Sequence, residues 1–371
     1  MAAFPTDVIT DVLRVLPVKS LTRLRCVSKS WGSLIKDPHF AKLHLHHSFK
    51  TNNNVKLVLD GRTDDDDDDD DDDAYETFSV DFDSLGDLEQ HPRPFPTTRS
   101  RFTSRIFGSC NGLLAVYHHE TGIALWNPST RTCHYLPKLT IGDVTERDYH
   151  ILGFGYDKIG DDYKVVRMIA SGKSVMIYSL KTDSWKRIKD CPYQIPVCEE
   201  QDGAYANGSL HWVGDERDTY FGGRLIFGLD LWAESFHQVP EPDIHFRNFG
   251  YKNVGVLGGS LCVFREYTNR YDEDHIILWV MKEYAVKESW SELIYLSGEE
   301  WRLTSIYYTR AIAYSRRGDQ ILLEDSGSSR QPAWFDLEKQ TGEVLRIPGA
   351  PRRFSAMIYI QSLVSVLPMH H

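Results

Sequence analysis

The stretch IALWNPSTRTCHYLP, residues 123–137, contains an apolar run, a polar turn and a second short run that ends in Pro. Short apolar runs bounded by turn residues are typical of paired β-strands. The same unit occurs five more times along the chain. The copies are SVDFDSL (79–85), VMIYSLKTDSWKRI (175–188), IFGLDLWAESFHQVP (226–240), IILWVMKEYAVKESW (276–290) and AWFDLEKQTGEVLRIP (333–348).

The spacing of these units is nearly constant. Measured at the last strand residue before each turn, they lie 44, 52, 51, 51 and 55 residues apart, at Phe82, Trp126, Tyr178, Leu229, Val280 and Phe335. A period of about 50 residues is that of one four-stranded, kelch-type propeller blade. The repeat therefore predicts an all-β domain that forms a six-bladed kelch-like β-propeller. A two-sheet β-sandwich is the alternative, although sandwich strands rarely repeat at a fixed period.

A Gly-containing turn precedes most of the units and predicts a second hairpin in each blade. Such turns require the positive φ that Gly and Asn adopt most readily. They are Asn111-Gly112, Asn207-Gly208, Gly258-Gly259 and Arg317-Gly318. The apolar stretch 356–366 is predicted to close the ring by pairing with the first blade.

The first 47 residues have a different pattern, which predicts three short helices separated at Pro17 and Pro38. Pro favours first turns and boundaries because it has no N–H and clashes inside a helix. Thr6 is the predicted N-cap of the first helix. Its apolar stripe comprises Val8, Ile9, Val12, Leu13 and Leu16, and the third helix repeats this spacing with Val27, Trp31, Leu34 and Ile35.

A helical unit of about 47 residues rarely buries enough apolar surface to be stable on its own. One interpretation is a cap that packs on the following domain, as most amphipathic helices pack on their own protein. The other is a unit that completes its core against a partner. Periodicity alone leaves both open.

Charge is unevenly distributed along the chain. The net charge is −11, but residues 64–73 are ten consecutive Asp, and the net charge without them is −1. Residues 1–48 contain seven Lys or Arg and three Asp, a balance that suits an acidic protein partner. They lack the dense basic stripe of a nucleic-acid-binding surface.

The acidic run is predicted to form a solvated loop, residues 60–75, on a hairpin, because ten like charges repel and cannot pack. The flanking VKLVLDG and AYETFSVDF alternate as strands do. A tolerated insertion is the simpler interpretation, and a docking site for a basic partner is the alternative.

Cysteine usage and hydropathy indicate the cellular compartment of the protein. Its six Cys include no CxxC pair, which favours free thiols in a reducing compartment. No signal peptide or apolar window of transmembrane length is apparent. We therefore expect a cytoplasmic and/or nuclear protein without membrane insertion.

Residues 4–40 resemble an F-box. The matching features are Phe4-Pro5, LPVKSL (16–21), RCVSKSW (25–31), Leu34-Ile35, Pro38 and Phe40, whereas Phe4 and Gly32 depart from the usual pattern. The resemblance implies binding to a Skp-type adaptor and, through it, to a cullin and a ubiquitin-conjugating enzyme. It implies adaptor contacts at Pro5, Val8, Leu13, Leu16, Pro17, Leu21, Cys26, Val27 and Trp31. For each of these residues, holding the three helices together is the alternative role.

The remainder of the chain resembles the F-box-associated domain of plants. The resemblance rests on GSCNGLL (108–114), LWNPSTR (125–131), LGFGYD (152–157) followed by DDYKVVRM (161–168), YSLKTDSW (178–185), GSLHWV (208–213), LDLWAESF (229–236) and WFDLE (334–338). It implies an F-box over residues 1–47 and an F-box-associated β domain over 48–371. The pattern is most similar to the group that restrains defence responses, which implies an immune receptor as the target.

No catalytic motif is present: the chain lacks GxSxG, HExxH and a P-loop. The clustered His44, His46 and His47 are predicted to lie on the surface or cap a helix, and His211 to be packed in a strand. We therefore expect no enzymatic activity, no metal and no cofactor. A propeller enzyme with a helical cap is a rival hypothesis that the missing catalytic set argues against.

The predicted function is substrate recognition in a Skp-cullin-F-box (SCF) ubiquitin ligase, which marks a bound target for proteasomal degradation. A non-ligase F-box interaction scaffold is the alternative. Loops on one face of the propeller are the expected target contacts, since loops carry recognition on rigid scaffolds. Within the segment REYTNRYDED (265–274), the predicted target-binding residues are Arg265, Tyr267, Arg270 and Tyr271. An ordinary polar hairpin loop is the simpler interpretation of this segment.

Overall fold

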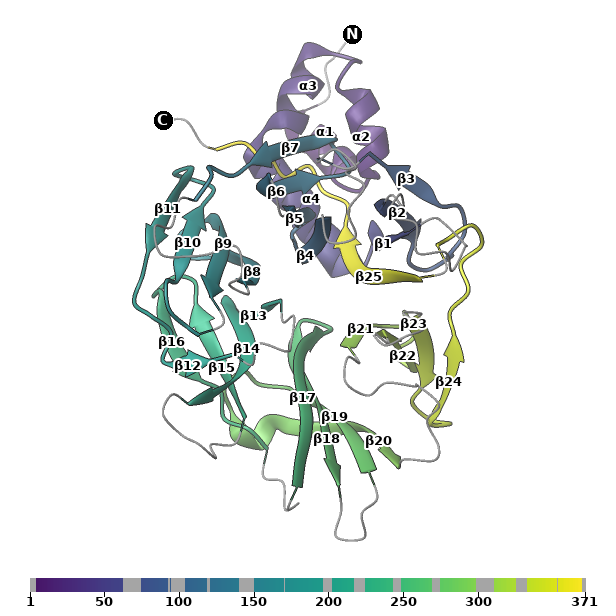
Figure 1. Ribbon diagram of the computed structural model, residues 1–371. Coiled ribbons are helices and arrows are strands. Elements are labelled where there is room, and N and C mark those ends of the chain that lie inside the picture. The colour runs from purple at the N-terminus through teal and green to yellow at the C-terminus, as the bar shows by residue number, and fades with distance from the viewer. Residues whose placement is uncertain are drawn as a thin grey trace.

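The computed structural model describes residues 5–62, 75–92, 94, 104–118, 121–139, 150–169, 171–195, 202–216, 224–242, 248–268, 274–297, 310–324, 332–351 and 353–368. In these ranges a group of helices comes first, followed by a ring of six antiparallel sheets (Figure 1). There is one sheet for each sequence repeat. The predicted six-bladed propeller is confirmed, and the β-sandwich alternative is wrong.

Four described helices precede the ring, one more than predicted: α1 (Thr6–Leu13), α2 (Val18–Leu24), α3 (Lys29–Lys36) and α4 (Pro38–Thr51). Pro38 is the first residue of α4, and the Asp37 side chain caps this helix by accepting the His39 N–H at 2.8 Å. Thr6 begins α1 but is not its N-cap, which is Pro5. The helix α4 continues across residue 47 and leads directly into the first strand.

Each blade contains four main strands, named here from the centre of the ring outward. Blade 1 has β25 (Arg353–Ile360), β1 (Val55–Arg62), β2 (Tyr75–Asp81) and β3 (Glu89–His91). Blade 2 has β4 (Ser104–Cys110), β5 (Leu113–His118), β6 (Gly122–Asn127) and β7 (Thr132–Tyr135). Blade 3 has β8 (His150–Asp157), β9 (Asp162–Ile169), β10 (Met176–Ser179) and β11 (Ser184–Arg187).

The other three blades follow the same order. Blade 4 has β13 (Ala204–Ala206), β14 (Ser209–Glu216), β15 (Leu225–Asp230) and β16 (Ser235–Gln238), with β12 (Tyr193–Gln194) as an extra partner of β14. Blade 5 has β17 (Asn248–Leu257), β18 (Ser260–Thr268), β19 (Asp274–Met281) and β20 (Trp290–Ser297), with the short helix η1 (Lys287–Ser289) before β20. Blade 6 has β21 (Arg310–Tyr314), β22 (Gln320–Glu324), β23 (Pro332–Asp336) and β24 (Thr341–Val344).

The ring closes within blade 1, because β25 pairs with β1 over eight residues, from Val55↔Ile360 to Arg62↔Arg353. This confirms the predicted closure by the C-terminal stretch. The strands β1 and β2 that flank the acidic run also pair with each other, as predicted. The run itself, residues 64–73, lies outside the described residues.

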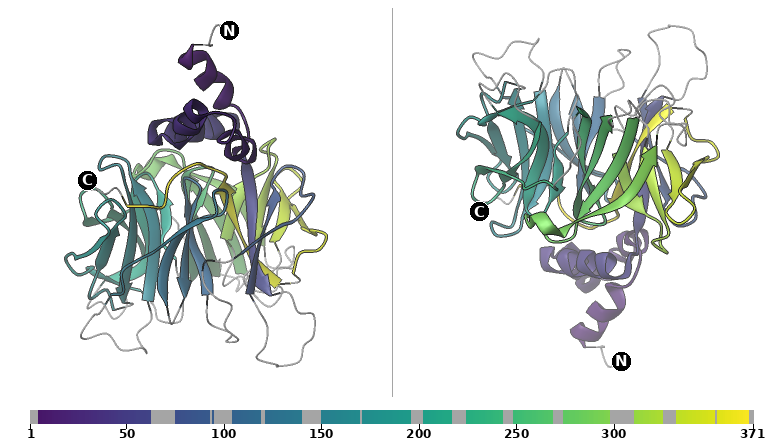
Figure 2. Two further views of the ribbon diagram at one scale, coloured as in Figure 1. Left: turned by 90° about the horizontal axis from the view of Figure 1, so that it is seen from above. Right: turned by 90° about the horizontal axis from the view of Figure 1, so that it is seen from below.

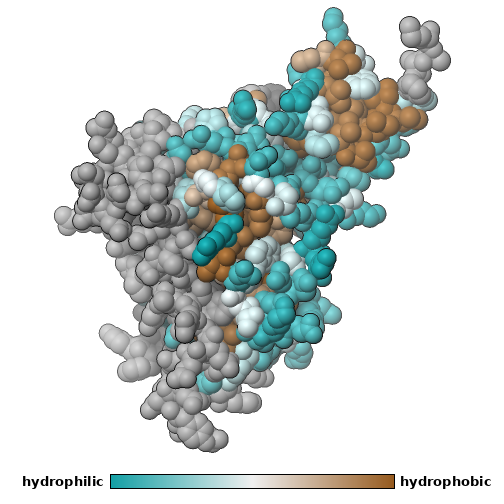
Figure 3. Space-filling model, turned by 90° about the vertical axis from the view of Figure 1, so that its right-hand side faces the viewer, coloured by the Kyte–Doolittle hydropathy of each residue, from teal (hydrophilic) through white to brown (hydrophobic). Residues whose placement is uncertain are grey.

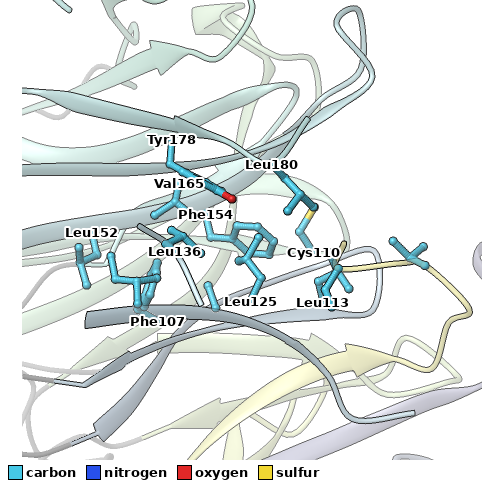
Figure 4. Close-up of a cluster of buried hydrophobic side chains, with 14 of the residues drawn as sticks. Phe107, Cys110, Leu113, Leu125, Leu136, Leu152, Phe154, Val165, Tyr178 and Leu180 are labelled. Carbon is cyan, nitrogen blue, oxygen red and sulfur yellow. The ribbon is translucent and has the colours of Figure 1, made fainter. Parts of the chain in front are cut away.

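Apolar side chains from neighbouring blades form the core of the ring. Between blades 2 and 3, Phe107, Leu113 and Leu125 pack against Leu152 and Phe154 (Figure 4). All five are at most 2% exposed. Each such side chain contributes about 1.5–3 kcal/mol when it leaves water. The blades are therefore held together by the alternating inward residues of the repeat.

The helices lie on one face of the ring (Figure 2). This face is called the helical end, and the opposite face the far end. Asp161, which follows β8, receives Lys42 Nζ of α4 at 2.5 Å, so the C-terminal end of β8 lies at the helical end. His150 begins the same eight-residue strand and lies about 23 Å away, at the far end.

Residues 361–368, called the C-terminal segment, pass between the helices and the ring (Figure 2). The buried Asn127 holds this segment by donating from Nδ2 to the Ser362 and Val364 carbonyls, at 3.1 and 2.8 Å. Leu363 packs into the helical core, and Val364 packs into the core between blades 2 and 3. Leu45 of α4 joins that second core as well. The helices are therefore packed on the ring both through the C-terminal segment and directly through α4.

Candidate functional site

Helix α1 and the turn that follows it, residues 6–16, have an inner and an outer apolar side. Ile9, Leu13 and Leu16 face inward and pack with α2, α3 and α4. An outer set with the same i, i+4, i+7 spacing, offset by one residue, is about half exposed: Val8 (47%), Val12 (55%) and Val15 (51%). Val27, 63% exposed, follows α2. These four valines are called the valine stripe, and Figure 3 shows apolar side chains on the lobe that the helices form.

The core of the helical unit is closed almost entirely by its own residues. Its buried members come from the four helices, and the only described residue from elsewhere is Leu363 of the C-terminal segment. No described blade side chain belongs to this core. The valine stripe is therefore left uncovered by the propeller.

The structure divides the nine predicted adaptor contacts into three groups. Pro5, Val8, Pro17, Cys26 and Val27 are exposed. Leu16 and Trp31 are half-buried against the helical core, so part of each remains accessible. Leu13 and Leu21 are 1% and 0% exposed and hold the helices together. Adaptor contact remains a prediction for all nine, and for Leu13 and Leu21 only an indirect contribution fits their burial.

Val12 and Val15 were not among the predicted contacts. The sequence signal for them is the second stripe Val8, Val12 and Val15, which runs parallel to the inner stripe at helical spacing. Both stripes are apolar, so the pattern alone does not tell which one faces inward.

Charge on the helical unit is only partly paired. Arg14 lies 3.3 Å from Asp11, and Lys42 binds Asp161. Arg25 Nε is buried without a hydrogen-bond partner, and burial lowers the pKa of this guanidinium. The described ion pairs thus leave most of the Lys and Arg residues of the helical unit without a described acidic partner, a charge balance that suits an acidic protein partner.

The predicted target-binding residues are packed more deeply than a recognition loop requires. Arg265 and Tyr267 lie on strand β18 rather than between strands, because the strand continues to Thr268. The Arg265 side chain is 11% exposed and Tyr267 is buried. Arg270 and Tyr271 lie outside the described residues. Direct target contact by these four residues remains a prediction.

Arg265 is part of a charged group at the far end of blades 4 and 5. Its Nη1 lies 3.4 Å from Glu241 Oε2, and the same oxygen receives Lys252 Nζ at 2.6 Å. Burial lowers the pKa of Lys252 to about 8, although Glu241 opposes the shift. In blade 6, Arg310 binds the buried Glu324 at 2.5 Å. The far end of the ring therefore contains ion pairs, Lys252–Glu241, Arg265–Glu241 and Arg310–Glu324, whose side chains are mostly buried.

The histidines fall in two kinds of environment. His44 is fully buried, with Nε2 2.9 Å from the Leu16 carbonyl, so a surface or capping role is wrong for this residue. His46 is exposed and His47 half-buried. His211 is packed as predicted, with Nε2 2.7 Å from the Tyr284 hydroxyl, and burial lowers its pKa to about 4.

No group of three or more His, Cys, Asp or Glu residues within the described ranges is arranged to hold a metal ion. None of the described helices has both the length and the apolar character that crossing a membrane requires.

The fold is a six-bladed propeller preceded by a helical unit with an uncovered apolar stripe. Two family models match the chain: an F-box domain over residues 2–43 and an F-box associated beta propeller domain over residues 73–366. The chain therefore belongs to the F-box proteins that carry an F-box-associated β-propeller.

Three curated relatives from Arabidopsis thaliana are similar along most of their length. F-box protein CPR1 is 34% identical over 98% of this chain and 89% of its own length. F-box protein At4g22390 is 31% identical over 98% of this chain and 90% of its own. F-box/kelch-repeat protein At3g23880 is 27% identical over 79% of each chain.

Proposed function

We propose that this protein is the substrate-recognition subunit of an SCF ubiquitin ligase. The helical unit binds a Skp-type adaptor, which links it to a cullin and a ubiquitin-conjugating enzyme. The propeller binds the protein to be ubiquitinated. The chain performs no covalent step itself and increases the rate of transfer by holding target and conjugating enzyme together.

The valine stripe is the observation that carries this proposal. Val8, Val12 and Val15 recur at helical spacing and all are about half exposed, and apolar side chains that gather on one exposed face commonly mark an interaction site. Burial of each half-exposed valine would contribute on the order of 1 kcal/mol to binding. The excess of Lys and Arg over Asp in residues 1–48 adds attraction for an acidic adaptor.

The two binding surfaces are separated by the thickness of the ring. The adaptor surface is on the helices, and the far end is about 23 Å from the helical end along β8. A target bound at the far end would leave the helical unit free for the adaptor. This separation lets the two partners bind at the same time.

The resemblance to defence-restraining F-box proteins makes an immune receptor the candidate target. On that hypothesis, the ligase would keep the abundance of the receptor low in unchallenged plant cells. Loss of this protein should then raise the amount of one immune receptor without changing its transcript.

The direct experiment uses the full chain, because Leu45 and Leu363 connect helices and ring and a truncation at residue 47 would disturb both cores. Tagged parent and the double variant Val8→Glu, Val12→Glu are captured from plant cells with the proteasome blocked. The parent should retain adaptor, cullin and target, and the variant should lose adaptor and cullin but keep the target. Equal adaptor recovery from both proteins would contradict the proposal.

A non-ligase F-box scaffold is the second candidate, favoured by the fact that an exposed stripe shows a docking surface but not ubiquitin transfer. Depletion of the adaptor distinguishes the two. A ligase receptor predicts that the captured target becomes longer-lived on depletion, whereas a scaffold predicts an unchanged half-life.

A further inference from the structure

A cluster of polar residues lies at the far end of the interface between blades 2 and 3. Arg105 is the second residue of β4, and Tyr117 lies directly opposite it on β5. His150 begins β8, and Arg167 lies near the end of β9. These four residues and Asp202 are called the mouth cluster.

Several contacts connect the members of the cluster. Arg105 forms an ion pair with Asp202, which precedes the bridge between Gly203 and Gly153 of β8. Tyr117 is close enough to Arg167 to act on its pKa. Arg167 Nη2 and Nε lie 3.0 and 3.4 Å from the ring nitrogens of His150. The cluster is therefore one continuous polar site that three blades build.

Arg167 differs from four other partly or fully buried cations near this end. Arg105, Lys252, Arg265 and Arg310 each lie within ion-pair distance of a carboxylate. The hydrogen-bond contacts of Arg167 within the described residues are with the His150 ring, and no described acid contributes to its pKa, which burial lowers. A half-buried guanidinium without a counter-charge costs free energy in the unliganded protein.

The described carboxylate of the cluster does not compensate the charge of Arg167. Among the described residues, Asp202 pairs with Arg105 and also acts on Arg310, whereas no carboxylate lies within ion-pair distance of Arg167. Arg105 and Asp202 remain 31% and 27% exposed, and Arg167 is also partly exposed. An incoming group can therefore reach the uncompensated charge from solvent.

We propose that the mouth cluster binds an oxyanion of the target protein, a carboxylate or a phosphoryl group, with Arg167 as the anchoring residue. The inference deepens the proposed receptor function by giving the chemistry of its target. A guanidinium has five N–H donors in a planar fork and binds planar or tetrahedral oxyanions in a bidentate way. Tyr117 and Arg105 supply further donors at the edge of the same site. The target segment is accordingly an acidic or phosphorylated stretch of chain.

The test uses the full chain with acetate and inorganic phosphate as probes of the two oxyanions. The variant is Arg167→Met, which keeps an unbranched stem and removes the charge. The matched control is Arg316→Met, because Arg316 is exposed and pairs with Asp83 at 2.9 Å at the helical end. Thermal unfolding is followed in chloride, acetate and phosphate at equal ionic strength.

At an anion concentration about ten times the dissociation constant, the midpoint of the parent should rise by about 2 °C relative to chloride. The unfolding midpoint of Arg316→Met should rise by the same amount, and the midpoint of Arg167→Met should be the same in all three anions. A larger rise with acetate identifies a carboxylate as the natural ligand, and a larger rise with phosphate identifies a phosphoryl group. An Arg167→Met midpoint that responds like the parent's, whether both rise or neither does, overturns the proposal.

The stability of the variant is a second criterion. In chloride, Arg167→Met should be at least as stable as the parent, because the substitution removes an uncompensated half-buried charge. A less stable variant would show that Arg167 serves the fold, and that result also overturns the proposal.

Target capture connects the site to the receptor function. Arg167→Met should reduce target recovery more than about tenfold, the loss expected for a charged hydrogen-bonded contact, and leave the adaptor bound. Undiminished target recovery would contradict the site alone, whereas loss of the adaptor from Val8→Glu, Val12→Glu tests the receptor role separately.

Discussion

Blades 2 and 4 are built from the same repeat but have different surroundings. The third strand ends at Asn127 in blade 2 and at Asp230 in blade 4, and both side chains accept N–H groups of the following turn. Of these two blades, blade 2 lies against the C-terminal segment, where Asn127 also donates to two carbonyls. Trp232, in the corresponding turn of blade 4, is 55% exposed.

Contact with the C-terminal segment explains why the third strand ends in Asn in blade 2 and in Asp in blade 4. A carboxylate is sufficient to accept turn amides, and Asp81, Asp230 and Asp336 do so in blades 1, 4 and 6. Blade 2 needs an amide, because only Asn offers an acceptor and two donors on a side chain of this size. The repeat thus supplies a common turn, and one change of side chain makes blade 2 the attachment point for the helical unit.

The largest expected effect comes from exchanging these two side chains. Asn127→Asp should destabilise the protein by roughly 3–5 kcal/mol, because it buries a carboxylate against two carbonyls that lose their donor. Asp230→Asn should cost less than about 0.5 kcal/mol, since its acceptor oxygen remains. Urea unfolding of both variants measures the loss of unfolding free energy. Equal losses would contradict the distinction between the two blades.

The second effect concerns Leu363, which connects the C-terminal segment to the helical core. Leu363→Ala should cost about 2–3 kcal/mol and expose α1 to α3 to proteolysis while the blades remain resistant. Leu367→Ala is the control, because Leu367 is 63% exposed and should change stability by less than about 0.5 kcal/mol. If protease cut both variants at the same rate, Leu363 would not be the connection.

The third effect compares Gly112 and Gly208, which have the same φ of +81°. A Cβ on Gly112 would lie 2.2 Å from Ser362 Oγ and 2.4 Å from the Ile360 carbonyl, whereas one on Gly208 would meet nothing within 4 Å. Alanine should therefore cost about 1–2 kcal/mol at Gly208, from backbone strain alone. At Gly112 the clash should add about 1–3 kcal/mol. The difference between the two urea midpoints tests the contact, and no difference would argue against it.

The smallest effect belongs to the exposed ion pair between Lys42 and Asp161. Hydrogen bonding by Lys42, and then by Tyr156, lowers the pKa of Asp161 below its ordinary 3.8. A lowered carboxyl pKa stabilises the folded state above about pH 4, and this contribution disappears as pH falls through the folded-state value. Because both side chains are well exposed, Lys42→Met should cost less than about 1 kcal/mol at pH 7. The cost should shrink as pH falls through the folded-state pKa of Asp161, and a cost that does not change with pH would have another origin.

Most of the propeller could be predicted because its signals are local. The period near 50 residues and the Gly-containing turns gave the six blades, and Phe82, Trp126 and Tyr178 lie on or directly after the third strand of their blades. The coupling between helices and ring could not be predicted. Asn127 and Ser362 are 235 residues apart, and no local pattern relates them.

The candidate site was predicted in part for similar reasons. The family motif located the helical unit, but adjacent apolar pairs such as Val12-Leu13 do not reveal which member faces inward. Arg265 and Tyr267 were expected in a loop, although β18 continues through both. Arg167 stood within a recognised motif, and its lack of a counter-charge depends on blades 2 to 4 meeting at one end of the ring.

The account depends on the valine stripe serving an adaptor rather than the fold, and one affinity measurement tests this. Purified full-length parent, Val12→Glu and Val344→Glu are titrated with a Skp-type adaptor, where Val344 is a comparably exposed valine on blade 6. Val12→Glu should weaken binding more than about tenfold without lowering the unfolding midpoint, and Val344→Glu should bind as the parent does. Parent-like adaptor affinity for Val12→Glu, or its failure to fold, would contradict the account.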